Sequence, residues 1–307
     1  MSKRRDPKER SSFLINLVLL LILLAGVILL AYPRVSDMWN RYENQQVIDG
    51  YQAQVSDLGE DRIQEMKTQA QAYNRNHKVN TIEDAFGSIY ETEEDGSYEE
   101  LLAVGNDGQM GSIEIPKLNL SLAIYHGLGE DVLEKGVGHV PGTSLPIGGK
   151  GSHAVLAGHR GLPNASLFTD LDQLEVGDFF YIHVLDETLA YQVDQIKTVL
   201  PDQCQDLALV SGQDYLTLVT CTPYGINTHR LLVRGVRTAY GEDTADRAVQ
   251  INPFLIAGGL VAVLCLLIFL IWRLPPRDSD KSKGGQERHL PEEEAELVDN
   301  RKRDEVK

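Results

Sequence analysis

The sequence predicts a mostly β domain, a barrel or a sandwich, with helices before it and a membrane-spanning helix at each end of the chain. Three observations lead to this prediction. Short apolar or alternating segments recur between residues 111 and 238, bounded by Gly, Pro, Asn and Asp. A helical spacing of apolar residues precedes them. Two long blocks without a charged residue flank both regions.

Composition argues against nucleic acid as a partner. The chain has 307 residues and a formal net charge of −16. Because binding to phosphate needs a concentrated basic surface, so acidic a chain is a poor candidate. We interpret the acidity as a solvated surface that keeps the protein soluble.

The first apolar block covers residues 13–32, which is long enough for a helix to cross the hydrocarbon core of a bilayer. Residues 1–12 are rich in Lys and Arg, so the positive-inside rule places them in the cytoplasm. A cleaved signal peptide is the alternative. We predict an uncleaved helix, because the block is long and its end at Leu30-Ala31-Tyr32 lacks a small-x-small pattern.

The second apolar block covers residues 251–272 and is again long enough for one span. Residues 273–307 begin with Arg and Lys, so this end is also predicted to be cytoplasmic, as a charged and disordered tail. The sequence therefore predicts a two-pass protein of the cell membrane, with the lipid bilayer as a partner and residues 33–250 on the extracytoplasmic face.

Two segments precede the β region. Residues 33–80 show roughly helical spacing and predict one or two amphipathic helices, divided near Gly59. Residues 81–108 are acidic and fit neither helix nor strand, so we expect a long loop. Loops this long in a compact domain are usually functional or disordered.

Residues 109–240 are predicted to form the β domain. Its spacing is typical of a closed or nearly closed barrel or of a sandwich. A short helix is expected at 167–174. The seven strands that we predict cover residues 111–116, 120–125, 153–159, 179–184, 189–199, 215–221 and 230–238.

Cys221 is a candidate nucleophile because it ends an apolar strand just before a Pro-Tyr-Gly turn. Arg230 opens the next strand, where its guanidinium would favour a thiolate and could hold an oxyanion. Cys265 lies in an apolar block, which leaves Cys204 as the other cysteine outside the predicted spans. A Cys204–Cys221 disulfide would silence the thiol, so bridging and catalysis are competing hypotheses.

His159 is the candidate acid and base, because it ends a predicted strand and leads into a Gly- and Pro-containing loop. No two histidines combine with Cys or acidic residues at metal-ligand spacing. We therefore predict neither a metal site nor a cofactor.

The string TLVTCTPYGINTHRLLVRG (217–235) resembles the signature of the sortase family, and HAVLAGHRGLP (153–163) resembles its histidine segment. The spacings of 62 residues from His159 to Cys221 and 9 from Cys221 to Arg230 also fit the family. The resemblance covers roughly residues 110–240.

This resemblance implies an eight-stranded sortase β-barrel, one strand more than we count. It implies that Cys221 attacks the carbonyl after threonine in an LPxTG-like sorting signal and forms a thioacyl-enzyme, which an amine resolves. His159 would be the acid and base, and Arg230 would bind the substrate carbonyl or the oxyanion. Thr220 would line the same cleft.

Two features resemble class C sortases, which polymerise pilins: the C-terminal span, and the long segment before the barrel. In that class the segment carries a lid with an Asp-Pro-aromatic motif. Here the place reads Asp84-Ala85-Phe86. Asp84 would pair with Arg230 and Phe86 would cover Cys221, while Ala85 in place of proline should leave the lid less rigid. The alternative is an acidic loop that folds elsewhere.

Class C membership implies transfer of the acyl group to a lysine amine on the next pilin subunit. One alternative is a sortase that anchors surface proteins to cell-wall peptide. Another is a non-catalytic membrane scaffold of the same fold, against which the intact trio of Cys221, His159 and Arg230 argues.

Overall fold

The computed structural model describes residues 7–76, 84, 86, 97–105, 107–162, 166–239 and 259. The chain divides into two compact units, Met1–Ala257 and Gly258–Lys307. All elements below belong to the first unit. The predicted span at 251–272, apart from Gly259, and the tail that follows it lie outside the described residues.

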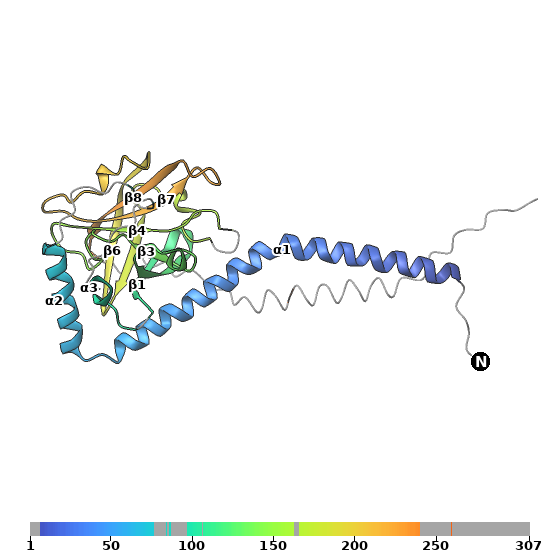
Figure 1. Cartoon of the computed structure of the whole chain (residues 1–307), viewed down its shortest axis with the longest axis horizontal. Helices are drawn as coiled ribbons and strands as arrows, with labels where there is room; N and C mark the ends of the chain where they lie inside the picture. Colours follow the sequence, from blue (N-terminus) through green and yellow to red (C-terminus); the bar gives the residue numbers. More distant parts are fainter. Residues whose placement is uncertain are drawn as a thin grey trace, which may run out of the picture. The chain divides into compact units, whose positions relative to one another are not determined.

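Two helices precede the barrel (Figure 1): α1 (Pro7–Ser56) and α2 (Glu60–Asn76). The break between them falls at Gly59, as the sequence predicted. The helix does not end with the apolar block, however, and continues through Pro33. By length and composition α1 is the one helix of the described residues that could cross a membrane.

Eight strands close into a barrel, which confirms the barrel and rules out the sandwich. The strand order around it is β1-β2-β3-β4-β7-β8-β6-β5. The strand missing from the sequence-based count is β3, whose three residues are too few to show an alternating pattern. The strands are β1 (Gln109–Ile115), β2 (Leu120–His126), β3 (Val137–His139), β4 (Ser152–Ala157), β5 (Phe179–Val184), β6 (Glu187–Val199), β7 (Asp214–Thr222) and β8 (His229–Thr238).

Short helical turns fill the connections. One of them, α3 (Ser97–Glu100), lies inside the segment that we predicted as a loop without helix. The short helix expected at 167–174 is a single turn, η2 (Leu171–Gln173). The others are η1 (Pro116–Leu118), α4 (Glu130–Leu133) and η3 (Gln205–Leu207).

Strand pairing brings three strand ends to one edge of the barrel. β4 runs parallel to β7, with Ala157 opposite Val219, so the carboxyl ends of both strands lie at the same edge. β8 runs antiparallel to β7, so it begins at that edge. We call the end of β4, the end of β7 and the start of β8 the site rim.

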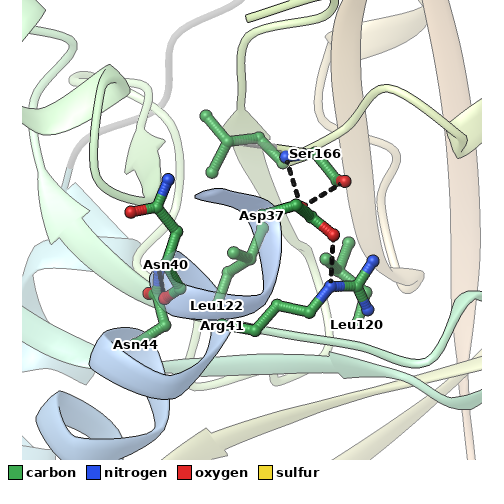
Figure 2. Close-up of a pocket in the computed structure, with 8 residues that line it drawn as sticks. Asp37, Asn40, Arg41, Asn44, Leu120, Leu122 and Ser166 are labelled. Atoms are coloured by element: carbon green, nitrogen blue, oxygen red, sulfur yellow. Dashed lines mark hydrogen bonds and ion pairs between the residues drawn. The ribbon is translucent and has the colours of Figure 1, made fainter. Parts of the chain in front are cut away.

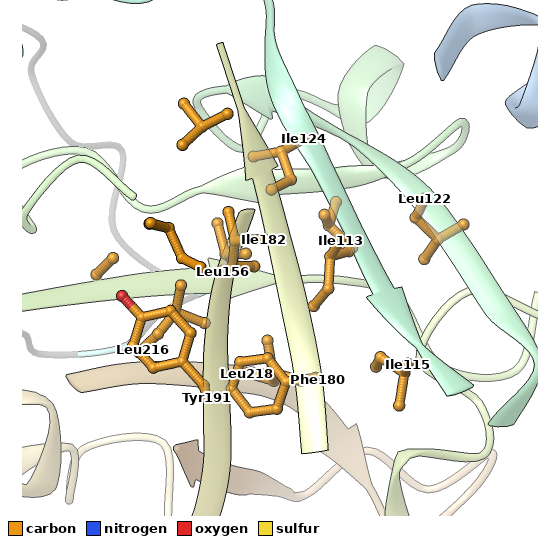
Figure 3. Packing of buried hydrophobic residues seen from close by; sticks show 14 of the residues in the cluster. Ile113, Ile115, Leu122, Ile124, Leu156, Phe180, Ile182, Tyr191, Leu216 and Leu218 are labelled. Atoms are coloured by element: carbon orange, nitrogen blue, oxygen red, sulfur yellow. The ribbon is translucent and has the colours of Figure 1, made fainter. Parts of the chain in front are cut away.

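The barrel interior is filled by alternate side chains of the strands (Figure 3). Phe180 and Ile182 of β5 and Leu216 and Leu218 of β7 are all wholly buried. This alternation is what a period of two residues produces when one face of a strand is inside. Gly235 of β8 leaves room for Phe180, since a Cβ there would lie 2.6 Å from the ring.

Buried and partly buried hydrogen bonds connect the helices to the barrel domain. The Tyr51 hydroxyl on α1 donates to the Met110 carbonyl (3.0 Å) and accepts from the Leu185 backbone N–H (3.1 Å). On α2, the Asn74 side chain donates to the Leu145 carbonyl (3.1 Å) and accepts from its N–H (2.7 Å). The helical segment is thus part of the folded domain.

Candidate active site

Cys221 and Arg230 lie directly opposite each other on β7 and β8. Arg230 is nearly buried, at 9% exposed, and Cys221 is half-buried. Burial raises the pKa of the Cys221 thiol, the nearby Arg230 charge lowers it, and Asp84 raises it, with a net increase. In this conformation the sulfur is therefore held as a thiol.

His159 lies two residues beyond the end of β4 rather than within the strand. The residue before it, Gly158, donates its N–H to the Val219 carbonyl of β7 (3.1 Å). The Gly158 carbonyl accepts from the Thr220 hydroxyl (2.7 Å). These bonds fix the backbone next to His159 against the residues next to Cys221.

Thr220 is wholly buried in this arrangement, and its hydroxyl faces β4. Thr220 therefore connects β7, which carries Cys221, to the end of β4, which leads to His159. A role on the surface of the substrate cleft stays a prediction.

Asp84 contacts Arg230 through two parallel bonds, Nε to Oδ1 (2.9 Å) and Nη2 to Oδ2 (2.8 Å). Such a bidentate, charge-assisted pair is among the stronger polar contacts in proteins, especially where both side chains are mostly shielded from water. Here the exposed fractions of the two side chains are 11% for Arg230 and 17% for Asp84.

Phe86 lies between the histidine and the arginine. Its ring stacks on His159, with centroids 6.3 Å apart and planes 16° apart. The Arg230 Cζ lies 5.3 Å from the same ring centroid, within range of a cation–π contact. Ala85, whose effect on rigidity was predicted from the sequence, lies outside the described residues.

Cys204 and Cys221 are both thiols, so the competing disulfide is not formed. Cys204 is buried and lies 3.2 Å, Sγ to O, from the Pro201 carbonyl, to which it donates. Cys221 is therefore in the reduced state, from which a nucleophilic thiolate can form.

Sequence reasoning missed Arg160. Its Nη1 donates to the Thr222 hydroxyl (2.9 Å) and its Nη2 pairs with Asp172. Its side chain is only 7% exposed, and the buried Nε has no acceptor among the described residues. Arg160 directly follows His159 and Thr222 directly follows Cys221, so this hydrogen bond connects the histidine loop to the end of the cysteine strand. The available signal was a basic residue directly after the candidate histidine.

No group of three or more His, Cys, Asp or Glu side chains in the part of the chain that the structure describes could hold a metal ion.

Residues 113–238 match the family model of the Sortase domain. Among solved structures, sortase C1 from Streptococcus agalactiae is 46% identical, with a TM-score of 0.59 over 64% of this chain and 100% of that chain. Sortase C from Streptococcus pneumoniae is 44% identical, with a TM-score of 0.57 over 64% and 97%. Sortase C-1 from Actinomyces oris is 41% identical, with a TM-score of 0.56 over 59% and 99%.

Curated relatives agree. Sortase A of Streptococcus agalactiae is 31% identical over 144 residues, which are 46% of this chain and 58% of the relative. Sortase D of Bacillus subtilis is 32% identical over 130 residues, 41% and 63% of the two chains. The match thus spans about three fifths of the length of these relatives. The chain belongs to the sortase family of cysteine transpeptidases, and its solved structural neighbours are class C sortases.

Proposed function

We propose that the chain is a membrane-anchored transpeptidase that cleaves an LPxTG-like sorting signal through a thioacyl-enzyme on Cys221. The acyl group then passes to a lysine amine of the next pilin subunit, which polymerises a pilus. The barrel acts on the extracytoplasmic face, with one predicted span on either side of it.

The observation that supports this proposal most directly is the arrangement at the site rim. Cys221 faces Arg230 across two paired strands, and Phe86 contacts both Arg230 and His159. A nucleophile, a fixed cation and an imidazole at one edge are what acyl transfer by a thiol needs.

The proposed chemistry has two halves. Once the thiol has lost its proton to His159, Sγ of Cys221 attacks the carbonyl carbon of the threonine, and Arg230 stabilises the oxyanion. The C–N bond breaks as His159 gives a proton to the leaving amine. The lysine amine then attacks the thioester, His159 takes its proton, and the C–S bond breaks to return the sulfur.

Asp84 and Phe86 form the proposed lid. Asp84 accepts hydrogen bonds from both Nε and Nη2 of Arg230. Substrate therefore has to displace Asp84 before these donors can hold an oxyanion. Shielding the thiol between turnovers would also limit hydrolysis of the thioester.

The choice of pilin as acceptor rests on the structural neighbours. The Streptococcus pneumoniae sortase C structure is described in terms of pilin substrate specificity. The relatives named sortase A keep the wall-anchoring reaction as the alternative.

Incubation with a purified pilin that carries a C-terminal sorting signal tests the proposal. We expect a ladder of covalent oligomers that a Cys221→Ala variant does not form. Transfer only to an added wall-peptide amine would instead favour the anchoring sortase. If neither product appears and mass spectrometry finds no acyl group on Cys221, the chain is a scaffold.

A further inference from the structure

The backbone at His159 is held by the far end of the loop that follows it. The Phe168 N–H donates to the His159 carbonyl (3.1 Å). The Phe168 ring is wholly buried and packs so closely on Gly158 that a Cβ there would lie 2.8 Å from the ring. Any displacement of Phe168 therefore moves the backbone that carries the imidazole.

This far end of the loop is bound to α1 (Figure 2). The Ser166 N–H donates to Asp37 Oδ1 (3.0 Å), and the Ser166 hydroxyl donates to the same oxygen. Asp37 Oδ2 accepts from Arg41 Nε (2.9 Å), and Arg41 Nη1 donates to the Asn119 carbonyl (2.6 Å). Arg41, on the same helix, thus orients the Asp37 carboxylate, and the carboxylate in turn binds Ser166 in the loop.

The residue between these two anchors is conformationally demanding. Leu167 has a φ of 35°, in the left-handed region that branched side chains seldom adopt, and it is 4% exposed. Such a conformation persists where neighbouring contacts impose it. The cavity beside this contact is only about 10 Å³, so the helix and the loop are closely packed here.

We propose that Asp37 is a positioning residue for His159, acting through Ser166 and Phe168. The inference rests on the proposed function, in which His159 is the acid and base. It means that the helix leaving the membrane is a working part of the active site, because a residue five positions beyond the predicted span sets where the imidazole lies.

The test uses the full chain in lipid nanodiscs and an Asp84→Asn background, so that the lid does not mask the rates. Asp37→Ala is compared with Asn44→Ala, which also removes a contact of α1 with the barrel but at the Lys135 carbonyl (3.1 Å) rather than at Ser166. For a fluorogenic Leu-Pro-x-Thr-Gly peptide we expect Asp37→Ala to lower kcat about tenfold with KM nearly unchanged, and to shift the pH profile of kcat. Asn44→Ala should change neither.

A second readout needs no substrate. In protein labelled with carbon-13 in its histidine rings, Asp37→Ala should shift the His159 signal, while Asn44→Ala should not. Asp37→Asn, whose Oδ1 still accepts from Ser166, should restore most of the wild-type kcat and the wild-type His159 signal. If Asp37→Ala does not fold, Ser166→Ala, which removes only the hydroxyl donor, takes its place.

The outcomes separate the two proposals. A wild type that cleaves no sorting peptide overturns the proposed function, and the His159 signal then still decides the positioning. If Asp37→Ala matches Asn44→Ala in kcat, pH profile and His159 signal, Asp37 is only a structural tether and the inference is wrong.

Discussion

The Arg230 guanidinium has two neighbours at the site rim that can carry a negative charge, the carboxylate of Asp84 and the sulfur of Cys221. Asp84 holds it through two hydrogen bonds, and the negative charge of Asp84 also works against a thiolate. Burial is the largest cause of the raised pKa of Cys221, and the charge of Asp84 adds to it. This arrangement therefore disfavours the thiolate, which is the reactive form of Cys221.

Replacing Asp84 with Asn should speed alkylation of Cys221 at pH 7 by on the order of tenfold, because it removes one cause of the raised pKa and loosens the lid. The rate of iodoacetamide labelling, followed by mass spectrometry, measures this. Asp194→Asn is the matched control, since Asp194 makes the same two-bond pair with Arg234 (3.0 and 2.8 Å). Equal labelling rates in the two variants would refute the lid.

Arg230→Lys keeps a positive charge but cannot present two parallel donors. If Arg230 holds the oxyanion, kcat for sorting-peptide cleavage should fall about 10²- to 10³-fold in the Asp84→Asn background. Arg234→Lys, at the other bidentate pair, should leave kcat near that of the parent. A loss confined to KM would show that Arg230 binds substrate without stabilising the transition state.

At the scale of elements, both ends of the segment that carries the proposed lid are fastened close together. The Tyr98 hydroxyl, on α3, contacts His139 Nδ1 (2.7 Å) at the end of β3. On the other side, Asn74 at the end of α2 is bonded to Leu145. The short strand that sequence analysis missed therefore helps to anchor α3 at one end of that segment.

Burial lowers the pKa of His139 from 6.5 to about 4. Between these pH values only the unfolded chain takes up this proton. As the pH drops from about 6.5 to about 4, His139 should therefore lower the free energy of unfolding by up to about 3 kcal/mol. Urea unfolding at pH 7 and pH 4.5 measures this. The drop should shrink in His139→Gln but persist in His229→Gln, whose described partner is the adjacent Thr228.

The sequence predicted seven strands near their observed positions, because alternation and turn residues mark strands of six or more residues well. β3 escaped because three residues carry no period. The apolar block at 13–32 and the helical spacing that follows it were predicted as separate segments. In the structure α1 runs through both to Ser56, and Tyr51 and its neighbours pack on the barrel.

Within the site, Cys221, His159 and Arg230 could be named because their types and spacings carry the resemblance to sortases. The contact of Asp37 with Ser166 could not, since it joins residues 129 positions apart without any local pattern. Arg160 stood beside a named residue, but its partners Thr222 and Asp172 become visible only when the strands are paired.

At the scale of the whole molecule, α1 is one continuous helix from its apolar half to its barrel-bound half. The part beyond the predicted span, Pro33–Ser56, measures about 35 Å at 1.5 Å per residue. Because Tyr51 and Asp37 are both bonded to barrel residues, this helix and the barrel should move as one body. The movement that brings a sorting signal to the site must then come from the substrate.

The proposed two-pass topology predicts how deletions behave. A chain lacking residues 13–32 should stay in the membrane fraction after an alkaline wash, because the predicted span at 251–272 still holds it. Removal of both segments should release it, as immunoblotting of the two fractions would show. Release by the first deletion alone would mean that 251–272 does not span the membrane.

The placement of sulfur and guanidinium on β7 and β8 has a consequence for biogenesis. These are the last two strands of the barrel to leave the ribosome. A growing chain that has reached only β6 carries the histidine but neither partner, and the nucleophile gains its neighbour only when the final hairpin forms. On the proposed mechanism, synthesis order alone keeps an unfinished chain from cleaving a sorting signal before the barrel is complete.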